Sequence, residues 1–130
     1  MPDTEELSRS AKMVSAILNR LAPKGVIPSQ LQHADFAEVD LDEMLFVQAM
    51  LWLMNEGLVH VEKQRGLRVF SGCQLSSRGY QVLGFRIETE DGLVTIEEAA
   101  KRVESSEGHY SKAGSFLGSL AGSFFKSMGS

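Results

Sequence analysis

The apolar positions at the start of the chain repeat with the period of an α-helix. We expect a helix from about Thr4 to Leu21, because its apolar residues recur at alternating spacings of four and three. They are Leu7, Ala11, Val14, Leu18 and Leu21. Asp3 and Glu6 resemble a capping box at its start, and Pro23 with Gly25 should end it.

A second helix-length stretch, Met44–Met54, is apolar on every side, since Gln48 is its only polar residue. A helix of this kind needs packing partners around most of its circumference, whereas a surface helix keeps a polar face. Asp40 should cap its N-terminus with Glu43 at position N3, and Gly57 should end it.

Strand patterns follow this helix. Leu58–Val61 is rich in β-formers and Leu67–Phe70 alternates apolar and polar residues, so the two should pair as a hairpin. The turn, Lys63–Gly66, ends in glycine and carries two basic residues. A short helix is expected within Gln74–Leu83, stopped by Gly84.

Two shorter elements complete this outline. Gln30–Phe36 should form a brief helix between the two long ones. Thr95 and Glu98 form a T-x-x-E capping box, which predicts a helix to about Val103. Ser105–Gly108 is a candidate linker.

The segment Ser111–Ser130 combines glycines at every fourth position with an apolar helical face. The glycines are Gly114, Gly118 and Gly122, and the face holds Leu117, Leu120, Ala121, Phe124 and Met128. Each glycine costs an isolated helix about 1 kcal/mol relative to alanine, so this helix needs a partner surface. Its own domain, a second subunit and a membrane interface near Lys112 and Lys126 all remain candidates.

Composition is that of one soluble domain. The chain has 130 residues, of which 43% are hydrophobic and 23% charged. No signal peptide is visible and the 11-residue apolar run is too short for a bilayer, so a cytoplasmic location is expected. The single cysteine, Cys73, cannot form an internal disulfide and suggests a buried structural thiol.

Charge is unevenly distributed around a net value of −4. Residues 35–56 contain six acidic residues and no Lys or Arg, whereas residues 57–87 carry a local net charge of +4. The basic residues of the expected hairpin are Lys63, Arg65 and Arg68. An electropositive face, if present, therefore comes from the middle of the chain.

Two short motifs resemble bacterial winged helix-turn-helix proteins. Leu53-x-x-Glu56-Gly57-Leu58-Val59 is similar to the junction between helix 3 and the wing, and Leu75-Ser76-x-x-Gly79 followed by Leu83 is similar to the segment after the wing. The resemblance covers residues 4–84. It implies a mainly α fold with a small β-hairpin, a winged-helix-like domain over 1–84. The residue patterns described above add a connecting segment with a short helix over 85–110 and a C-terminal amphipathic helix over 111–130.

The resemblance also implies DNA binding, because helix 3 of such domains enters the major groove. Here that helix begins with Asp40, Asp42 and Glu43, which would face phosphates with like charge. Only Gln48 and Asn55 are of the type that reads bases. Phosphate contacts by Lys63, Arg65 and Arg68 of the wing stay open as an alternative.

The leading hypothesis is a non-enzymatic interaction or assembly module that forms a homo-oligomer. Its expected surface joins helix 3 and the C-terminal helix, because aromatic residues and methionine suit adaptable interfaces. The candidate residues are Phe46, Met50, Trp52, Leu53, Leu117, Leu120 and Phe124. The alternatives are a DNA-binding regulator and a peripheral membrane protein; a protein partner is also open.

No motif indicates catalysis, a metal or a cofactor. His33, His60 and His109 are isolated along the chain, and the C-terminal glycines lack the Lys-Ser/Thr ending of a phosphate-binding loop. The acidic residues before Met44 are more simply helix caps than cation ligands.

Overall fold

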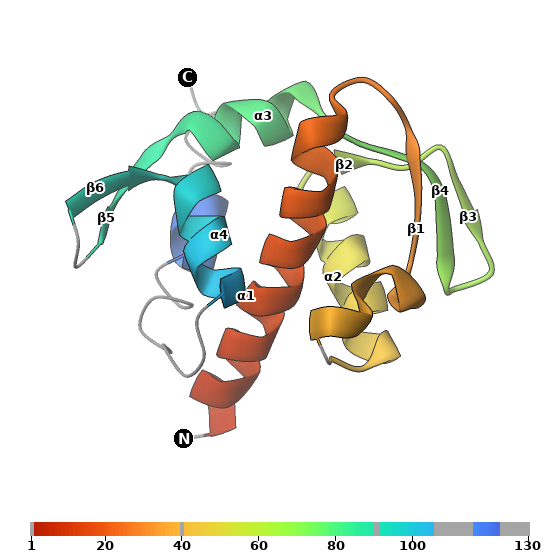
Figure 1. Ribbon diagram of the computed structural model, residues 1–130, viewed down its shortest axis with the longest axis horizontal. Coiled ribbons are helices and arrows are strands. Elements are labelled where there is room, and N and C mark those ends of the chain that lie inside the picture. The colour runs from red at the N-terminus through yellow and green to blue at the C-terminus, as the bar shows by residue number, and fades with distance from the viewer. Residues whose placement is uncertain (1, 40, 90–91, 106–115, 123–130) are drawn as a thin grey trace.

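The computed structural model describes residues 2–39, 41–89, 92–105 and 116–122, which form helices around two small antiparallel sheets (Figure 1). The helices are α1 (Pro2–Leu21), η1 (Ala22–Lys24), η2 (His33–Val39), α2 (Glu43–Asn55), α3 (Ser77–Gly84), α4 (Ile96–Ser105) and a last helix over residues 116–122. The strands are β1 (Ser29–Gln32), β2 (Val59–His60), β3 (Lys63–Arg65), β4 (Val69–Leu75), β5 (Arg86–Thr89) and β6 (Gly92–Thr95).

The longest described strand, β4, organises the larger sheet. It pairs antiparallel with β1 on one side, and with β3 and β2 in turn on the other. Leu31 of β1 and Gln64 of β3 both lie opposite Phe70, so the three share one face of the sheet. Phe70 is fully buried, which identifies this face as the side toward the core.

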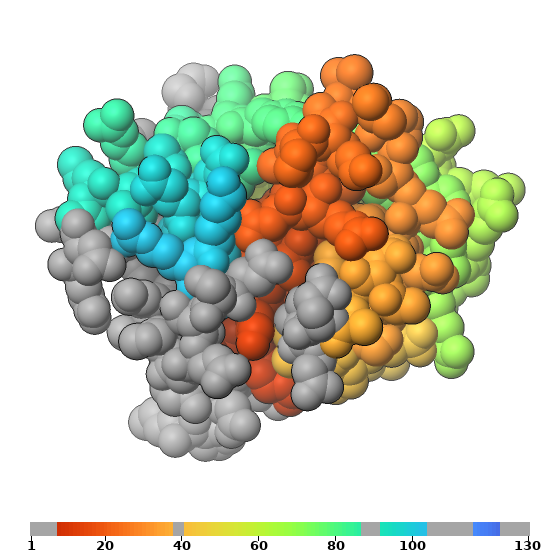
Figure 2. Space-filling model, in the orientation of Figure 1, coloured from red at the N-terminus to blue at the C-terminus, as the bar shows by residue number. Residues whose placement is uncertain are grey.

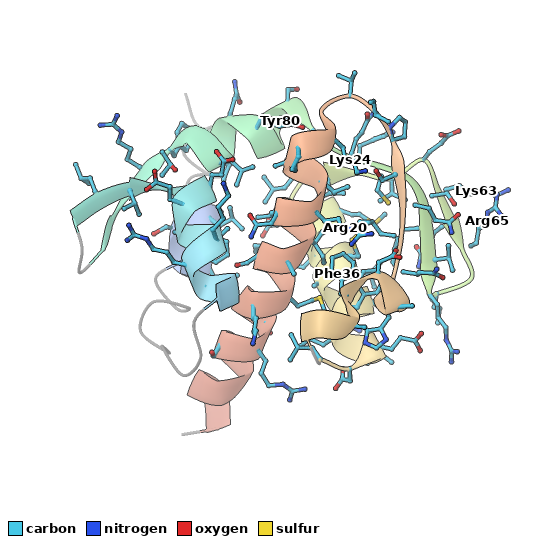
Figure 3. All side chains as sticks on the ribbon, in the orientation of Figure 1. Arg20, Lys24, Phe36, Lys63, Arg65 and Tyr80 are labelled. Atoms are coloured by element: carbon cyan, nitrogen blue, oxygen red, sulfur yellow. The ribbon has the colours of Figure 1, made fainter. Side chains whose placement is uncertain are left out.

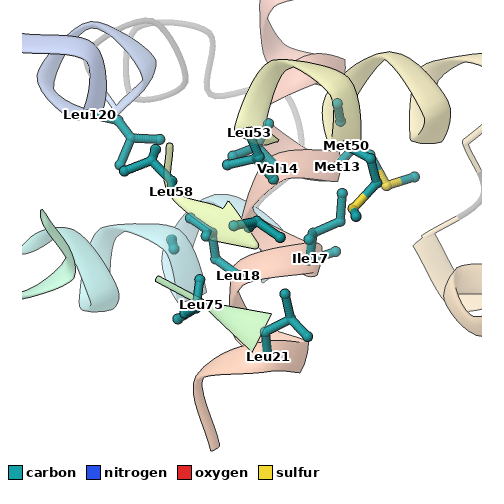
Figure 4. Packing of buried hydrophobic residues seen from close by; sticks show 14 of the residues in the cluster. Met13, Val14, Ile17, Leu18, Leu21, Met50, Leu53, Leu58, Leu75 and Leu120 are labelled. Carbon is teal, nitrogen blue, oxygen red and sulfur yellow. The ribbon is translucent and has the colours of Figure 1, made fainter. Parts of the chain in front are cut away.

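Helix α1 runs through the centre of the molecule (Figure 1), with the larger sheet and α2 on one side and α4 on the other. Every residue from 11 to 18 is buried except Lys12. Figure 4 shows Val14, Ile17 and Leu18 of α1 among leucines from α2, β4 and the last helix. Ser15, the one buried polar side chain of the described core, donates a 2.6 Å hydrogen bond to the carbonyl of Ala11.

The last helix, residues 116–122, lies behind α4 (Figure 1) and belongs to the same core. Phe116 and Leu120 are each only 1% exposed, and Leu120 points toward Leu58 (Figure 4). The expected amphipathic helix is therefore confirmed over these residues, and it packs on its own chain. Gly114, Phe124 and Met128 lie outside the described residues.

The helix expected over Gln30–Phe36 is wrong in its first half. Ser29–Gln32 is a strand, and helical structure begins only at His33. The local sequence contains no apolar run that marks a strand, but Leu31 is buried opposite Phe70 of β4. Pairing with a distant strand therefore overrode local preference.

The N-cap of the apolar helix is also different from the expectation. Asp42, not Asp40, caps α2, and its carboxylate accepts a 2.7 Å hydrogen bond from the backbone N–H of Leu45. Glu43 is then the first residue of the helix. Both aspartates suit a cap chemically, and the choice depends on where the preceding 3-10 helix ends.

A hairpin is present, but the expected pairing of Leu58–Val61 with Leu67–Phe70 is wrong: β2 pairs with Gln74 and Leu75, and β3 pairs with residues 69–71. Lys63 and Arg65 lie in β3 rather than in a turn, and β4 extends through Leu75, which was expected to lie with the following helix. Gly72 interrupts β4 with a φ of +66°, at a place where a side chain would collide with Glu62. This irregularity lets the strand continue past β3 to pair with β2.

The two motifs that carry the winged-helix resemblance meet in space. Ser76 caps α3 by accepting a 3.0 Å hydrogen bond from the N–H of Gly79, and its hydroxyl donates at 2.6 Å to the carbonyl of Gly57. A side chain at position 79 would collide with the carbonyl of Leu58. Gly79 is therefore required by the close contact between the end of α2 and the start of α3, and Gly57 by its φ of +75°.

The segment after residue 84 holds more structure than the connecting role expected of it. The strands β5 and β6 pair with each other as a second hairpin, and α4 packs against α1 and α3. The capping box is confirmed in part, since the N–H of Glu98 donates to the hydroxyl of Thr95 at 3.2 Å. Within the described residues, no helix is both long and apolar enough to cross a membrane.

The burial of the last helix leads to a stability prediction. Phe116→Ala should lower the free energy of unfolding by about 3–5 kcal/mol, because it leaves a cavity in the core. Urea unfolding followed by circular dichroism measures this. Leu93→Ala, at an exposed position of β6, is the matched control and should change stability by less than about 0.5 kcal/mol. Equal effects of the two substitutions would contradict the placement of this helix.

Candidate interaction surface

Basic side chains from α1 and from the turn after β3 pair with the acidic residues at the start of α2. Asp42, the N-cap of α2, also pairs with Arg9 of α1 at 3.3 Å. Glu43 pairs with Arg68, which follows β3, at 3.4 Å. These pairs are exposed and contribute little stability, about 0–1 kcal/mol each. They do neutralise the acidic start of α2.

One side of α2 is buried against the sheet and α1. The ring of Phe46 lies between Phe36 of η2, at 5.5 Å, and Phe70 of β4, at 5.8 Å. The other buried residues of this helix are Val47, Ala49, Met50 and Leu53. The apolar composition of α2 is thus explained in part by an ordinary core contact.

The opposite side of α2 is exposed and uncharged. Met44, Gln48, Leu51 and Asn55 follow one another at spacings of four, three and four, so they form one stripe. Met44 is 64% exposed and Leu51 is 37% exposed, values that are high for large apolar side chains. We call this stripe of four residues the α2 face.

A pocket of about 400 Å³ lies beside the α2 face, between α1, α2 and the last helix. Trp52 and Leu117 approach it from α2 and from the last helix, and both are half-buried. The described residues that line it are Ser10, Val14, Leu45, Gln48, Ala49, Trp52 and Leu117. Gln48 belongs to both features, so the pocket and the α2 face are continuous.

The structure separates the residues expected to form an interaction surface. Phe46, Met50, Leu53 and Leu120 lie in the core of the chain, where a partner could not contact them without unfolding it. Trp52 and Leu117 are brought together at the pocket, although they are 65 positions apart. Phe124 lies outside the described residues. Sequence reasoning missed the exposed Met44 and Leu51 as a pair, because only the packing of α2 shows which side faces outward.

The basic residues of the hairpin occupy different environments. Lys63 and Arg65 are exposed on the same side of β3 (Figure 3). The segment that contains β3 lies at the right-hand edge of the molecule (Figure 2). Neither has an ion-pair partner among the described residues. Arg68, in contrast, pairs with Glu43. Two of the three expected phosphate-contacting residues thus keep free charges.

The exposed apolar turn between η1 and β1 was not expected from the sequence. Val26 is 87% exposed and Ile27 is 65% exposed. The phenol of Tyr80 lies 3.1 Å from the carbonyl oxygen of Ala22 and 3.4 Å from that of Gly25, so it holds the turn in place. In the sequence, Pro23 and Pro28 indicate a turn at this place. They do not show that the apolar side chains of the turn are exposed.

The remaining polar groups serve structural roles. His33 contacts the carbonyl of Leu41, and His60 is exposed on β2. Arg20 lies over the ring of Phe36 at 5.6 Å and near Asp35 at 4.0 Å (Figure 3). Among the described residues, no three His, Cys, Asp or Glu side chains are grouped as metal ligands would be. His109 lies outside the described residues.

Comparison of the chain with protein-family models, with curated proteins and with solved structures gave no match.

Cys73 is buried, and its thiol donates to the carbonyl of Phe70 at 3.2 Å. Desolvation raises the pKa of this thiol from 9.0 to about 11, against a smaller lowering by a backbone hydrogen bond at Leu31. The folded state therefore keeps a proton that the unfolded state loses first. The contribution of the Cys73 thiol to the free energy of unfolding is therefore fully present below about pH 9 and is lost as the pH rises toward 11.

Cys73 should accordingly resist thiol reagents in the folded protein. Labelling with a disulfide reagent at pH 8 should be slow and should follow unfolding, because only the thiolate is nucleophilic. The control is the same reaction in urea, where one thiol per chain should react rapidly. Rapid labelling of the folded protein would show that the thiol is accessible.

Proposed function

We propose that this chain is a winged-helix-like interaction module that self-associates through the α2 face. The order of elements supports the fold assignment: α1, β1, η2 and α2 are followed by β2, β3 and β4. In a winged helix, three helices likewise precede a wing, and a strand between the first two helices completes the small sheet. The contact between Ser76 and Gly57 adds support, because it joins the two motifs of the resemblance.

The observation that carries the functional proposal is the uncharged α2 face. In a winged-helix frame α2 takes the position of the helix that reads DNA. Here its outward side chains are Met44, Gln48, Leu51 and Asn55, and none is basic. An exposed apolar stripe is better suited to another protein surface than to a polyanion.

A second copy of the chain is a simple partner for such a face. Two α2 helices related by a two-fold axis would each present Met44 and Leu51 to the other, so the contact is self-complementary. The α2 face carries no charge, so like-charge repulsion between two copies would not oppose the contact. The ion pairs of Asp42 and Glu43 leave the acidic start of α2 neutralised beside it.

Met44→Glu should weaken self-association at least tenfold, because it places a charge in a desolvated contact. Light scattering across a concentration series measures this against the monomer mass of 14.3 kDa. Leu93→Glu, which introduces the same charge at another exposed large apolar residue, is the control and should associate like the unaltered protein. A monomeric unaltered protein at about 100 μM, or equal behaviour of both variants, would refute self-association through this face.

Removal of residues 111–130 is a poor test of the same idea. The deletion would take Phe116 and Leu120 out of the core, so a changed mass would reflect unfolding as well as a lost contact. The same burial weakens the alternative of membrane binding through this segment, since these two apolar side chains face the protein.

DNA binding through the wing is the second candidate. Its support is the pair of exposed cations, Lys63 and Arg65, on one side of β3. Two such contacts would anchor a duplex weakly through its phosphates, without reading bases. The net charge of −4 gives no general attraction to DNA, so binding would depend on these residues.

Duplex binding, if the wing provides it, should weaken about tenfold between 50 and 200 mM salt, as two phosphate contacts require. Fluorescence anisotropy of a labelled duplex measures this. Arg65→Glu should abolish the binding, whereas Arg86→Glu, the same charge reversal on β5, should reduce it only slightly. Absence of a salt-sensitive signal at about 100 μM protein would exclude this candidate.

A further inference from the structure

We propose that the pocket between α1, α2 and the last helix binds a small uncharged molecule that is mainly apolar and carries one hydrogen-bonding group. This inference goes beyond self-association, because it assigns a ligand to the neighbouring pocket rather than a partner to the α2 face. The volume of about 400 Å³ lies within the range of small-molecule sites. A monocyclic or bicyclic ring compound fits this size.

The lining defines the chemistry of the ligand. Most of it is aliphatic or aromatic, from Val14, Leu45, Ala49, Trp52 and Leu117. Among the described residues that line the pocket, none has an ionisable side chain. A charged ligand would therefore lose hydration without gaining a counter-ion, whereas an apolar ring loses no favourable hydration on entry.

The two polar lining residues account for the hydrogen-bonding group. Ser10 contributes a hydroxyl from α1, and Gln48 contributes a side-chain amide from α2. The amide has one weak contact, 3.8 Å to the sulfur of Met44, which leaves most of its hydrogen-bonding capacity for a ligand. Both groups are neutral, so they select an alcohol, phenol or amide rather than an ion.

The position of the pocket couples the ligand to the last helix. Among the described lining residues, Leu117 belongs to this helix and the others belong to α1 and α2. The described residues of this helix include Gly118 and Gly122, two residues that weaken it by about 1 kcal/mol each relative to alanine. A ligand that touches all three helices stabilises the docked arrangement.

Fluorescence of the only tryptophan, Trp52, reports directly on this pocket. The probe is 4-bromobenzyl alcohol, a neutral ring whose bromine quenches tryptophan. Quenching should saturate with a dissociation constant on the order of 0.1–1 mM, as expected for a compound of this size. The matched charged compound, 4-bromobenzoate, should quench only in proportion to its concentration, by collision.

Two leucine substitutions on α1 form the matched pair of variants. Ser10→Leu fills the pocket from one wall and should weaken binding of the alcohol at least fivefold. Ser8→Leu places the same side chain on the same helix, at a half-buried position that does not line the pocket, and should bind like the unaltered protein. Circular dichroism checks that both variants are folded.

Hydrogen exchange supplies a second readout, in which saturating alcohol should slow exchange of the amides of residues 116–122. All measurements are repeated at a protein concentration at which light scattering gives the monomer mass of 14.3 kDa, so that failure of self-association and failure of ligand binding are separated. Non-saturating quenching by the alcohol, equal binding by Ser10→Leu and Ser8→Leu, or saturable binding of 4-bromobenzoate would each overturn the proposal.

Discussion

The burial of the middle of α1 between the elements on either side of it is the constraint on which the rest of the structure depends. Its residues 11–18 are buried except for Lys12, and the sheet, α2, α4 and the last helix all belong to the core around it. A helix in this position can hold few polar groups, and Ser15 is accommodated because its hydroxyl bonds to the carbonyl of Ala11 within the same helix. Helix α1 is thus the element against which both the larger sheet with α2 and, on the other side, α4 pack.

The central place of α1 determines what α2 can do. Although α2 has the more uniformly apolar sequence, it contacts the core on one side only, through residues such as Phe46 and Met50. Its other side is left outside, with Met44 and Leu51 exposed. Helix α1 occupies the centre because its small residues Ala11, Ser15 and Ala16 let several elements approach it at once. Helix α2 therefore packs beside it and leaves one side exposed, and this side is the interaction surface we propose.

Residue type alone was enough to select some members of the candidate site. Trp52 and Leu117 stand out in the sequence as large apolar residues in unusual surroundings, and Lys63 and Arg65 as cations of an expected hairpin turn. Ser10, by contrast, carries no signal in its own neighbourhood. It lines the pocket because α1 and α2 pack against each other and the last helix lies beside them, an arrangement set by contacts far apart in the chain.

Features that rest on a few neighbouring residues are encoded locally. The repeat of α1, the cap of Thr95 and the stop at Gly57 are of this kind, because helix periodicity and capping bonds span at most one or two turns. Folding in three dimensions chose Asp42 over Asp40 as a cap, turned Ser29–Gln32 into a strand against β4, and set which side of α2 faces solvent. Each of these outcomes is governed by the burial or pairing of distant residues, whose free energy exceeds the small local preferences of the chain.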